Sequence, residues 1–327
     1  MLNTTLHYKI FKDFTRNPPQ QVPLGSSEEN KAYLSFWEYL ESGSNINLIG
    51  NPGKNDILLT KLVTGRKGTS INLHSSFKKP HKCIFPKKQD IQTVFFLDEK
   101  LESEKNKYRS KNGYLFGFID DYKQVWKDLA LIEKPEVLPV RKDTEVNFSS
   151  WSKLSEYILP YTDLIIVDNY MFEDSISVYN LIRIIEEFSK KTPVKFNLLL
   201  ISFKHDKQLF NIKDYYSNIS KLLNDKEIKC DLSIVLANQS IKEHDRGIFN
   251  NYLRIKSGDS FTFFDKNEKF LTKGTDIDFH SMVKRDKFNA SNAALKNINR
   301  IVNILRDPIY KEKRLIGNLD NGLLNFK

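Results

Sequence analysis

The sequence predicts an α/β protein with a mixed sheet covered by helices, and three observations carry this prediction. Between residues 150 and 265, short apolar runs alternate with amphipathic stretches in the order strand, helix, strand, helix, and then three strands. The runs 164–167 and 198–201 are apolar throughout, as strands buried on both faces of a sheet are. The chain has 327 residues, of which 40% are hydrophobic, so it is long enough for two domains with packed cores.

The N-terminal part has the weaker pattern of secondary structure. Residues 17–30 are polar and proline-containing, which predicts a loop, and residues 32–40 follow as a short amphipathic helix. Residues 133–150 contain Pro135 and Pro139 among several charges and form the best linker candidate. Strands are expected at 45–49, 93–97 and 114–119, and the charged residues 100–112 are expected to form a loop.

From residue 150 onward the pattern is stronger. Apolar residues recur at helical spacing in 176–190 and again in 212–222, which predicts two amphipathic helices. A third helix, at 290–305, has an apolar stripe that we expect to pack on the body of the protein: Leu295, Ile298, Ile301 and Ile304. A helix is also expected at 151–159, with strands at 163–168, 194–203, 231–237, 248–256 and 260–265, the last two antiparallel around a turn at Ser257-Gly258-Asp259.

These elements define three expected parts of the chain. The first is an N-terminal α/β region over residues 1–140, whose fold the sequence leaves undefined. The second is the α/β domain over residues 147–282. The third is a basic helical tail over residues 283–327.

The charge of the chain is compatible with a polyanionic partner. Its formal net charge is +10 and its pI is about 9.2. Such a balance permits binding to nucleic acid, to an acidic membrane surface or to an acidic protein, and it does not choose among them.

One stretch of the N-terminal region concentrates this charge. Residues 57–89 contain eight lysines and arginines, no acidic residue, and interleaved histidines and phenylalanines. Cations for phosphates and flat rings for bases are what single-stranded nucleic acid requires. A solvated surface loop is the alternative. The candidate contacts to nucleic acid are Lys78, Lys79, Lys82, Lys87 and Lys88.

Other classes of protein are disfavoured by what the sequence lacks. The apolar runs are far shorter than the ~20 residues of a membrane span, and the N-terminus does not resemble a secretory signal, so we expect a cytoplasmic protein. The two cysteines, Cys83 and Cys230, are far apart, which argues against a disulfide framework or a cysteine-built zinc site. We expect no cofactor and no metal. The acid pairs Asp98/Glu99 and Asp120/Asp121 follow apolar strands and leave a magnesium site open as an alternative to solvated strand ends.

The sharpest motif begins at His244. The phospholipase D signature reads H-x-K, four residues, D, six residues and G-S, and this spacing places His244, Arg246, Asn251 and Gly258 at its positions. In that chemistry the histidine attacks phosphorus and the lysine binds the phosphate oxygens. Arginine can still bind phosphate through two parallel hydrogen bonds, whereas asparagine lacks the charge that stabilises an imidazolium. His244 is therefore the candidate nucleophile, and Arg246, Asn251 and Lys256 are candidate phosphate ligands.

The second half of such a site is missing. A working enzyme needs two motifs that face each other, one histidine acting as nucleophile and the other as general acid. At the end of the first strand of the domain stands Asp168-Asn169-Tyr170, without a histidine. Asp168 and Tyr170 are therefore candidates for orienting the site rather than for catalysis.

Residues 150–265 resemble the phospholipase-D-like domain at the C-terminus of proteins with microtubule-interacting and transport modules, together with its prokaryotic relatives. The resemblance rests on residues 157–161, on 165–170, on His244-Asp245-Arg246 and on 255–258 followed by Phe263 and Phe264. It implies a phospholipase-D-like fold, usually without the full catalytic set. It also implies acidic-phospholipid binding in the eukaryotic branch and a place in larger, defence-related systems in the prokaryotic one.

The sequence thus leads to one main functional hypothesis and three alternatives. We expect a phosphate-recognising module that binds nucleic acid, with other protein subunits, in a prokaryotic assembly for which anti-phage defence is the suggested role. The first alternative is an active, metal-independent nuclease or phosphodiesterase completed by a homodimer that brings two His244 sites together. The others are a protein that binds an acidic membrane surface and a purely structural subunit.

Overall fold

The computed structural model describes residues 1–16, 18, 27–50, 56–65, 70–74, 91–142, 145–238, 246–272 and 274–325. The chain forms two compact units. Unit 1 consists of Met1–Lys134 and Ser281–Asn289, and unit 2 of Pro135–His280 and Ala290–Lys327. Most of the predicted linker and of the predicted tail therefore belong to unit 2.

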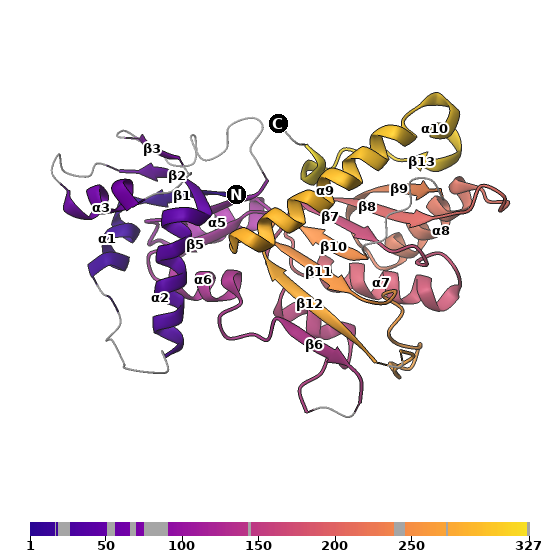
Figure 1. Cartoon of the computed structure of the whole chain (residues 1–327), viewed down its shortest axis with the longest axis horizontal. Coiled ribbons are helices and arrows are strands. Elements are labelled where there is room, and N and C mark those ends of the chain that lie inside the picture. The colour runs from indigo at the N-terminus through magenta and orange to yellow at the C-terminus, as the bar shows by residue number, and fades with distance from the viewer. Residues whose placement is uncertain are drawn as a thin grey trace. The chain divides into compact units, whose positions relative to one another are not determined.

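Unit 1 is built on a parallel sheet of five strands in the order β3-β2-β1-β4-β5 (Figure 1). The strands are β1 (Leu2–His7), β2 (Ser44–Ile49), β3 (Ile71–His74), β4 (Thr93–Leu97) and β5 (Leu115–Phe118). The helices are α1 (Tyr8–Arg16), α2 (Glu28–Glu38), the π-helical turn η1 (Tyr39–Gly43), α3 (Ile57–Gly65), α5 (Glu102–Lys111) and α6 (Tyr122–Ala130).

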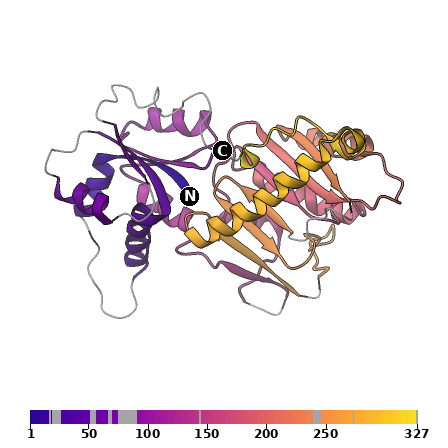
Figure 2. The ribbon, with the colours of Figure 1, turned by 45° about the horizontal axis from the view of Figure 1, so that its top comes forward.

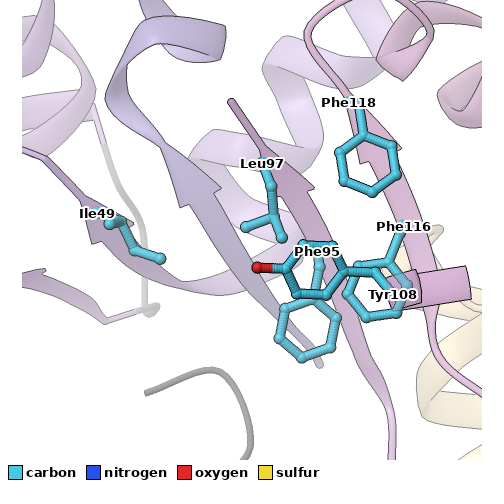
Figure 3. Packing of buried hydrophobic residues seen from close by; sticks show 6 residues of the cluster. All are labelled: Ile49, Phe95, Leu97, Tyr108, Phe116 and Phe118. Carbon is cyan, nitrogen blue, oxygen red and sulfur yellow. The ribbon is translucent and has the colours of Figure 1, made fainter. Parts of the chain in front are cut away.

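Both faces of β4 are covered in unit 1. On one face Phe95 and Leu97 lie in a cluster of rings and aliphatic side chains, completed by Ile49, Tyr108, Phe116 and Phe118 (Figure 3). On the other face Phe96 packs edge-on against Phe36 of α2, with ring centroids 5.3 Å apart. A parallel strand buried on both sides reads as a continuous apolar run, and the strand predicted at 93–97 is confirmed for that reason.

Unit 2 is built on a mixed sheet of eight strands in the order β13-β9-β8-β7-β10-β11-β12-β6 (Figure 1). The strands are β6 (Val137–Val140), β7 (Asp163–Val167), β8 (Phe196–Phe203), β9 (Cys230–Ala237), β10 (Gly247–Asn250), β11 (Leu253–Ser257), β12 (Thr275–Ser281) and β13 (Leu315–Ile316). The helices are the 3₁₀ turn η2 (Trp151–Glu156), α7 (Ser175–Ser189), α8 (Ile212–Asp225), α9 (Arg285–Leu305), α10 (Pro308–Arg314) and the 3₁₀ turn η3 (Gly322–Leu324).

The predicted order of elements in unit 2 is confirmed. Strands β7, β8 and β9 are parallel and alternate with α7 and α8, whereas β10 and β11 are antiparallel. All five residues of β7 are buried, so both faces of the sheet are covered there. Helix α9 runs across the sheet in both ribbon views, and its buried side chains include Leu295, Ile298 and Leu305 (Figure 2). The protein is therefore α/β, with one parallel and one mixed sheet.

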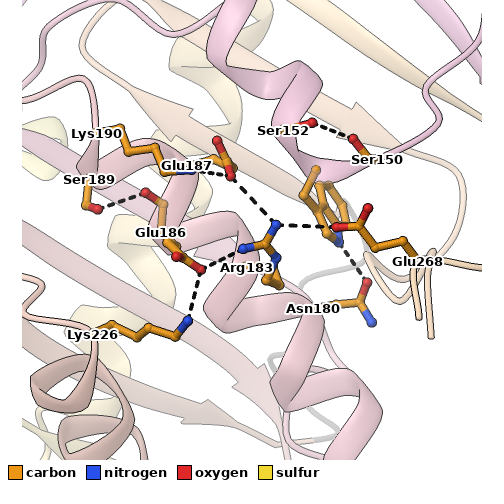
Figure 4. Close-up of polar contacts among 11 residues, drawn as sticks. Ser150, Ser152, Asn180, Arg183, Glu186, Glu187, Ser189, Lys190, Lys226 and Glu268 are labelled. Carbon is orange, nitrogen blue, oxygen red and sulfur yellow. Dashed lines mark hydrogen bonds and ion pairs between the residues drawn. The ribbon is translucent and has the colours of Figure 1, made fainter. Parts of the chain in front are cut away.

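Helix α7 is fixed in place by a buried amide and an ion network (Figure 4). The fully buried Asn180 accepts a hydrogen bond from the indole of Trp151 at 2.7 Å and donates one to the carbonyl of Phe264 at 2.7 Å. One turn further on, Arg183 lies 2.8 Å from Glu186 and 3.4 Å from Glu268. These bonds attach the helix to η2 and to the chain that follows β11.

The structure corrects five local expectations. Residues 248–256 form a hairpin, not one strand, because the side chain of Asn250 accepts the amides of Tyr252 and Leu253 and turns the chain. The predicted strand 260–265 contributes only the isolated bridge from Phe264 to Phe270. Within the predicted linker, Val137–Val140 form β6, which pairs with β12. The charged loop predicted at 100–112 is largely α5, and Ile304 of α9 is 37% exposed.

Asp163, at the start of β7, is a buried carboxylate whose pKa is raised by burial. It accepts hydrogen bonds from the amide of Gly322, from Asn197 and from Thr162, at 2.7, 3.0 and 2.7 Å. The folded state binds this proton more tightly than the unfolded state, where the pKa is about 3.9, so the contribution of Asp163 to stability is largest in acid. It then falls as the pH rises through the raised pKa of the folded state.

We expect Asp163→Asn to remove that fall. An asparagine carbonyl can still accept from Gly322 and Asn197, and its amide can donate to Thr162. The variant should therefore be at least as stable as the wild type at pH 7 and lose this advantage near pH 4. Urea unfolding of the full chain from pH 4 to pH 8 measures this, with Asp225→Asn, exposed at the end of α8, as the matched loss of one carboxylate. Identical pH profiles for wild type and Asp163→Asn would contradict the prediction.

No helix in the described ranges is both long and apolar enough to cross a membrane.

Candidate phosphate-binding site

The carboxyl ends of β7, β8 and β9 meet at one edge of the unit 2 sheet, which we call the carboxyl edge (Figure 1). Because β10 is antiparallel to β7, its first residue, Gly247, pairs with Val167 at the same edge. The backbone amide of Asp168 donates a hydrogen bond to the carbonyl of Ile201, and the amide of Lys204 donates one to the carbonyl of Ala237. The sheet thereby brings together segments that lie up to 80 residues apart in the sequence.

Asp168 organises this edge from below the surface. It is 2% exposed, and its Oδ1 accepts the amide of Tyr170 at 3.0 Å. Its Oδ2 accepts the hydroxyl of Ser260 at 2.6 Å and the amide of Phe261 at 2.7 Å. The carboxylate therefore links the end of β7 to the chain after β11. Ser260 has no counterpart among the predicted site residues.

Arg246 lies beside Tyr170 at the surface of the carboxyl edge. Its Nη1 donates to the carbonyl of Gly258 at 2.5 Å, and its guanidinium carbon lies 5.6 Å from the centre of the Tyr170 ring. Its Nε is buried and has no hydrogen-bond partner in the described part of the chain. A carbonyl and a ring orient the guanidinium, but neither neutralises its charge. The geometry leaves a positioned cation that still has donors for an anion.

The other two predicted phosphate ligands occupy different places. Lys256 pairs with Gly247 across the hairpin, so it lies at the carboxyl edge. Strand alternation, however, directs it to the face opposite Arg246.

Asn251 is buried at the far end of β7, which corrects the prediction that it contacts phosphate. Its Oδ1 accepts the amides of Thr162 and Asp163, both at 3.2 Å, and its amide donates to the Thr162 hydroxyl at 3.0 Å. The hairpin turn carries it there.

The remaining predicted site residues cannot be placed by the structure. The candidate nucleophile His244 lies outside the described residues, and so do the candidate nucleic-acid contacts Lys78, Lys79, Lys82, Lys87 and Lys88. Of the predicted set, the structure brings together Asp168, Tyr170 and Arg246.

The acid pairs of unit 1 are engaged by basic side chains. Asp98 pairs with Lys9, Asp120 with Lys105, and Asp121 with Arg109. The hydrogen bond from Lys105 also lowers the pKa of Asp120. In the described ranges, no three His, Cys, Asp or Glu side chains come together as a metal-ligand group. The pairs thus act as ion-paired strand ends within unit 1.

Neither the protein-family models nor the curated proteins compared with this sequence give a match. The geometry of the carboxyl edge is therefore the ground on which a function can be assigned.

Proposed function

We propose that this chain is a phosphate-recognising module that binds nucleic acid through Arg246 at the carboxyl edge of unit 2. The observation that carries the proposal is a guanidinium oriented by a ring and a carbonyl, with no carboxylate paired to it among the residues that the structure describes. Its place in the spacing His244-x-Arg246, and the resemblance of residues 150–265 to phospholipase-D-like domains, support a degenerate site of that type. We place the module in a larger prokaryotic assembly, with other protein subunits as partners.

The chemistry of Arg246 suits a phosphodiester. A guanidinium presents a planar fork of donors that matches two phosphate oxygens, and it is more weakly hydrated than an ammonium group. Tyr170 is 38% exposed and holds the guanidinium from one side, so less side-chain entropy is lost when phosphate binds. Asp168 directs both carboxylate oxygens to the amides of Tyr170 and Phe261 and to the hydroxyl of Ser260 rather than to this guanidinium.

The two units would contribute differently to affinity. Most of the excess of basic over acidic residues lies in unit 1, especially in the predicted basic stretch 57–89. That charge would supply long-range, salt-sensitive attraction. Arg246 would supply a local, oriented contact. Removing Arg246 should therefore weaken binding without abolishing its dependence on salt.

The test is Arg246→Ala in the full chain, titrated into labelled DNA and RNA oligonucleotides in EDTA at several salt concentrations. Loss of a charge-assisted hydrogen bond of about 1.5–3 kcal/mol predicts affinity about 10- to 100-fold lower. The salt slope should fall by about 1. Arg300→Ala is the matched control, because Arg300 is exposed on α9 and donates its hydrogen bonds within the described part of the chain to Asn297.

Two outcomes would overturn the proposal. Unchanged affinity and salt slope in Arg246→Ala would show that the cation does not contact phosphate. A wild-type protein that binds no nucleic acid but floats with acidic phospholipid vesicles would transfer the chain to the membrane-binding class.

A further inference from the structure

Three pairs of a basic side chain and an aromatic ring follow one another along the carboxyl edge of unit 2. Arg246 lies over the ring of Tyr170, and Tyr170 stands just after β7. Lys204, just after β8, lies over Tyr215 in the first turn of α8, 5.4 Å from the ring centre. Arg314 lies over Phe210, 5.1 Å from the ring centre, and donates to the last carbonyl of β9, at Ala237. Sequence spacing alone does not reveal this row, because its members come from five separate segments.

The three pairs are joined by packing into one surface. The ring of Phe172, two residues after Tyr170, lies 5.1 Å from that of Tyr215. Arg314 donates to the carbonyl of Lys204 at 3.1 Å. The row therefore runs from the end of β7 past β8 to β9, where α8 and α10 lie beside the strand ends (Figure 1).

A hollow of about 500 Å³ lies at the β9 end of this row. Its lining includes Phe210, Tyr310 and Lys313, together with the apolar side chains of Leu209 and Ile309. Leu209 is fully exposed and Ile309 is 76% exposed. Apolar surface rimmed by polar and basic groups is typical of a ligand site. A nucleobase, which has apolar faces and polar edges, matches that lining.

The dimensions suit a short single strand. Neighbouring strands lie about 4.8 Å apart, so the step from β7 to β9 is roughly 10 Å. That length spans about two steps between unstacked nucleotides, which lie further apart than the roughly 3.4 Å of stacked ones, so about three bases of one strand fit along it. Aromatic rings can reach base faces only where the bases are unpaired and unstacked.

The edge is also unsuited to a duplex. Glu173 is exposed three residues after Tyr170, and Asp206 and Glu312 line the hollow, so carboxylates as well as cations lie at this edge. Two rows of duplex phosphates would meet those carboxylates, whereas one strand can place its phosphates on Arg246 and Lys204 and its bases on the rings. Arg314 is buried and ion-paired with Asp206, so it orients Phe210 rather than contacting phosphate.

We propose that the carboxyl edge of unit 2 selects single-stranded nucleic acid, with bases stacked along Tyr170 and Tyr215 and a terminal base in the Leu209–Phe210 hollow. This inference rests on the proposed function and adds to it the class of nucleic acid and its path. Because stacking contributes about 1–3 kcal/mol per base and involves no phosphate, loss of a ring should lower affinity without changing the salt slope.

The test compares Tyr215→Ala with Tyr216→Ala, using a labelled single strand of 12 nucleotides and the corresponding duplex. Tyr216 is the matched control, since it is the next residue on α8 and is equally half-buried, but it lines a different hollow near Cys230. We expect the wild type to prefer the single strand and Tyr215→Ala to bind it about 5- to 100-fold more weakly, with an unchanged salt slope. Tyr216→Ala should bind like the wild type.

Leu209→Glu provides a second arm that folding cannot confound, because Leu209 makes no buried contact to lose. A carboxylate in the hollow should repel the strand and lower its affinity. Equal binding of duplex and single strand, with both variants like the wild type, would overturn the inference while leaving the Arg246 proposal intact. Absence of any nucleic-acid binding by the wild type would overturn both.

Discussion

Replacing Asp168 by alanine is expected to destabilise unit 2 by about 3 kcal/mol or more. The buried carboxylate accepts the amides of Tyr170 and Phe261 and the hydroxyl of Ser260. Alanine leaves these three donors without an acceptor, and each unsatisfied buried donor costs about 1–3 kcal/mol. This loss of stability should also disturb the candidate site. The same hydrogen bonds position Tyr170 and the chain after β11, where the carbonyl of Gly258 accepts from Arg246.

The measurement is hydrogen exchange of the full chain under mild urea, read on peptides from β7 and from residues 257–264. These peptides should exchange faster in Asp168→Ala, whereas peptides from the parallel sheet of unit 1 should not change. Asp259→Ala is the matched control, because Asp259 is exposed in the same turn. Asp168→Asn should be intermediate, since the amide keeps one acceptor oxygen but turns a donor towards two other donors. Wild-type protection of β7 in Asp168→Ala would contradict the prediction.

The sequence predicts best those elements whose bounds follow from a continuous local pattern of apolar residues. Strand β4 coincides with the predicted 93–97, and α7 lies within one residue of the predicted 176–190 at each end. In both cases the apolar pattern is continuous and its ends carry polar residues. Helix α7 also begins at a conventional cap, where Asp174 accepts the amides of Ile176 and Ser177.

Unit 1 was harder to predict because long-range contacts decide its elements. Strand β1 includes Thr4, which is fully buried and lies 2.7 Å from the hydroxyl of Tyr39 on η1. Such a strand does not read as apolar. Helix α5 buries Lys105, whose ammonium pairs with Asp120 15 residues later. A charged stretch of this kind resembles a loop until its distant partner is known.

The candidate site shows the same division. Asp168 and Arg246 lie at the same edge because Gly247 pairs with Val167. That the two segments are adjacent is expected from the resemblance to phospholipase-D-like domains, and not from sequence spacing. The prediction that Asn251 contacts phosphate is wrong because motif spacing assumes a continuous strand. The two asparagines at 250 and 251 instead form a hairpin turn. The row of ring–cation pairs escaped prediction because only the fold collects its segments at one edge.

Arg314 gives the second large expected effect, because it closes the β9 end of the carboxyl edge. Its side chain is almost completely buried, and its Nη1 lies 3.1, 2.9 and 3.1 Å from the carbonyls of Lys204, Leu236 and Ala237. Its Nη2 pairs with Asp206 at 2.5 Å. Alanine would leave three carbonyls without this donor and remove the anchor of β13, which starts at the next residue. We expect a loss of about 3 kcal/mol or more, because a hydrogen bond from a charged group contributes about 1.5–3 kcal/mol and this buried guanidinium makes several of them, whereas the exposed Asp206 stays solvated.

Arg314→Lys separates the charge from the shape of this side chain. A lysine keeps the cation but lacks the planar fork that reaches several acceptors at once, so part of the stability should return. Because Phe210 rests on the guanidinium, single-strand affinity should remain lower than in the wild type even where the lysine variant is folded. Urea unfolding followed by exchange of β8 and β9 peptides measures the first effect, and the 12-nucleotide titration measures the second. Arg306→Ala is the matched loss of one arginine, because Arg306 is exposed just after α9. If Arg306→Ala and Arg314→Ala were equally stable, Arg314 would not hold the β9 end of the carboxyl edge as proposed.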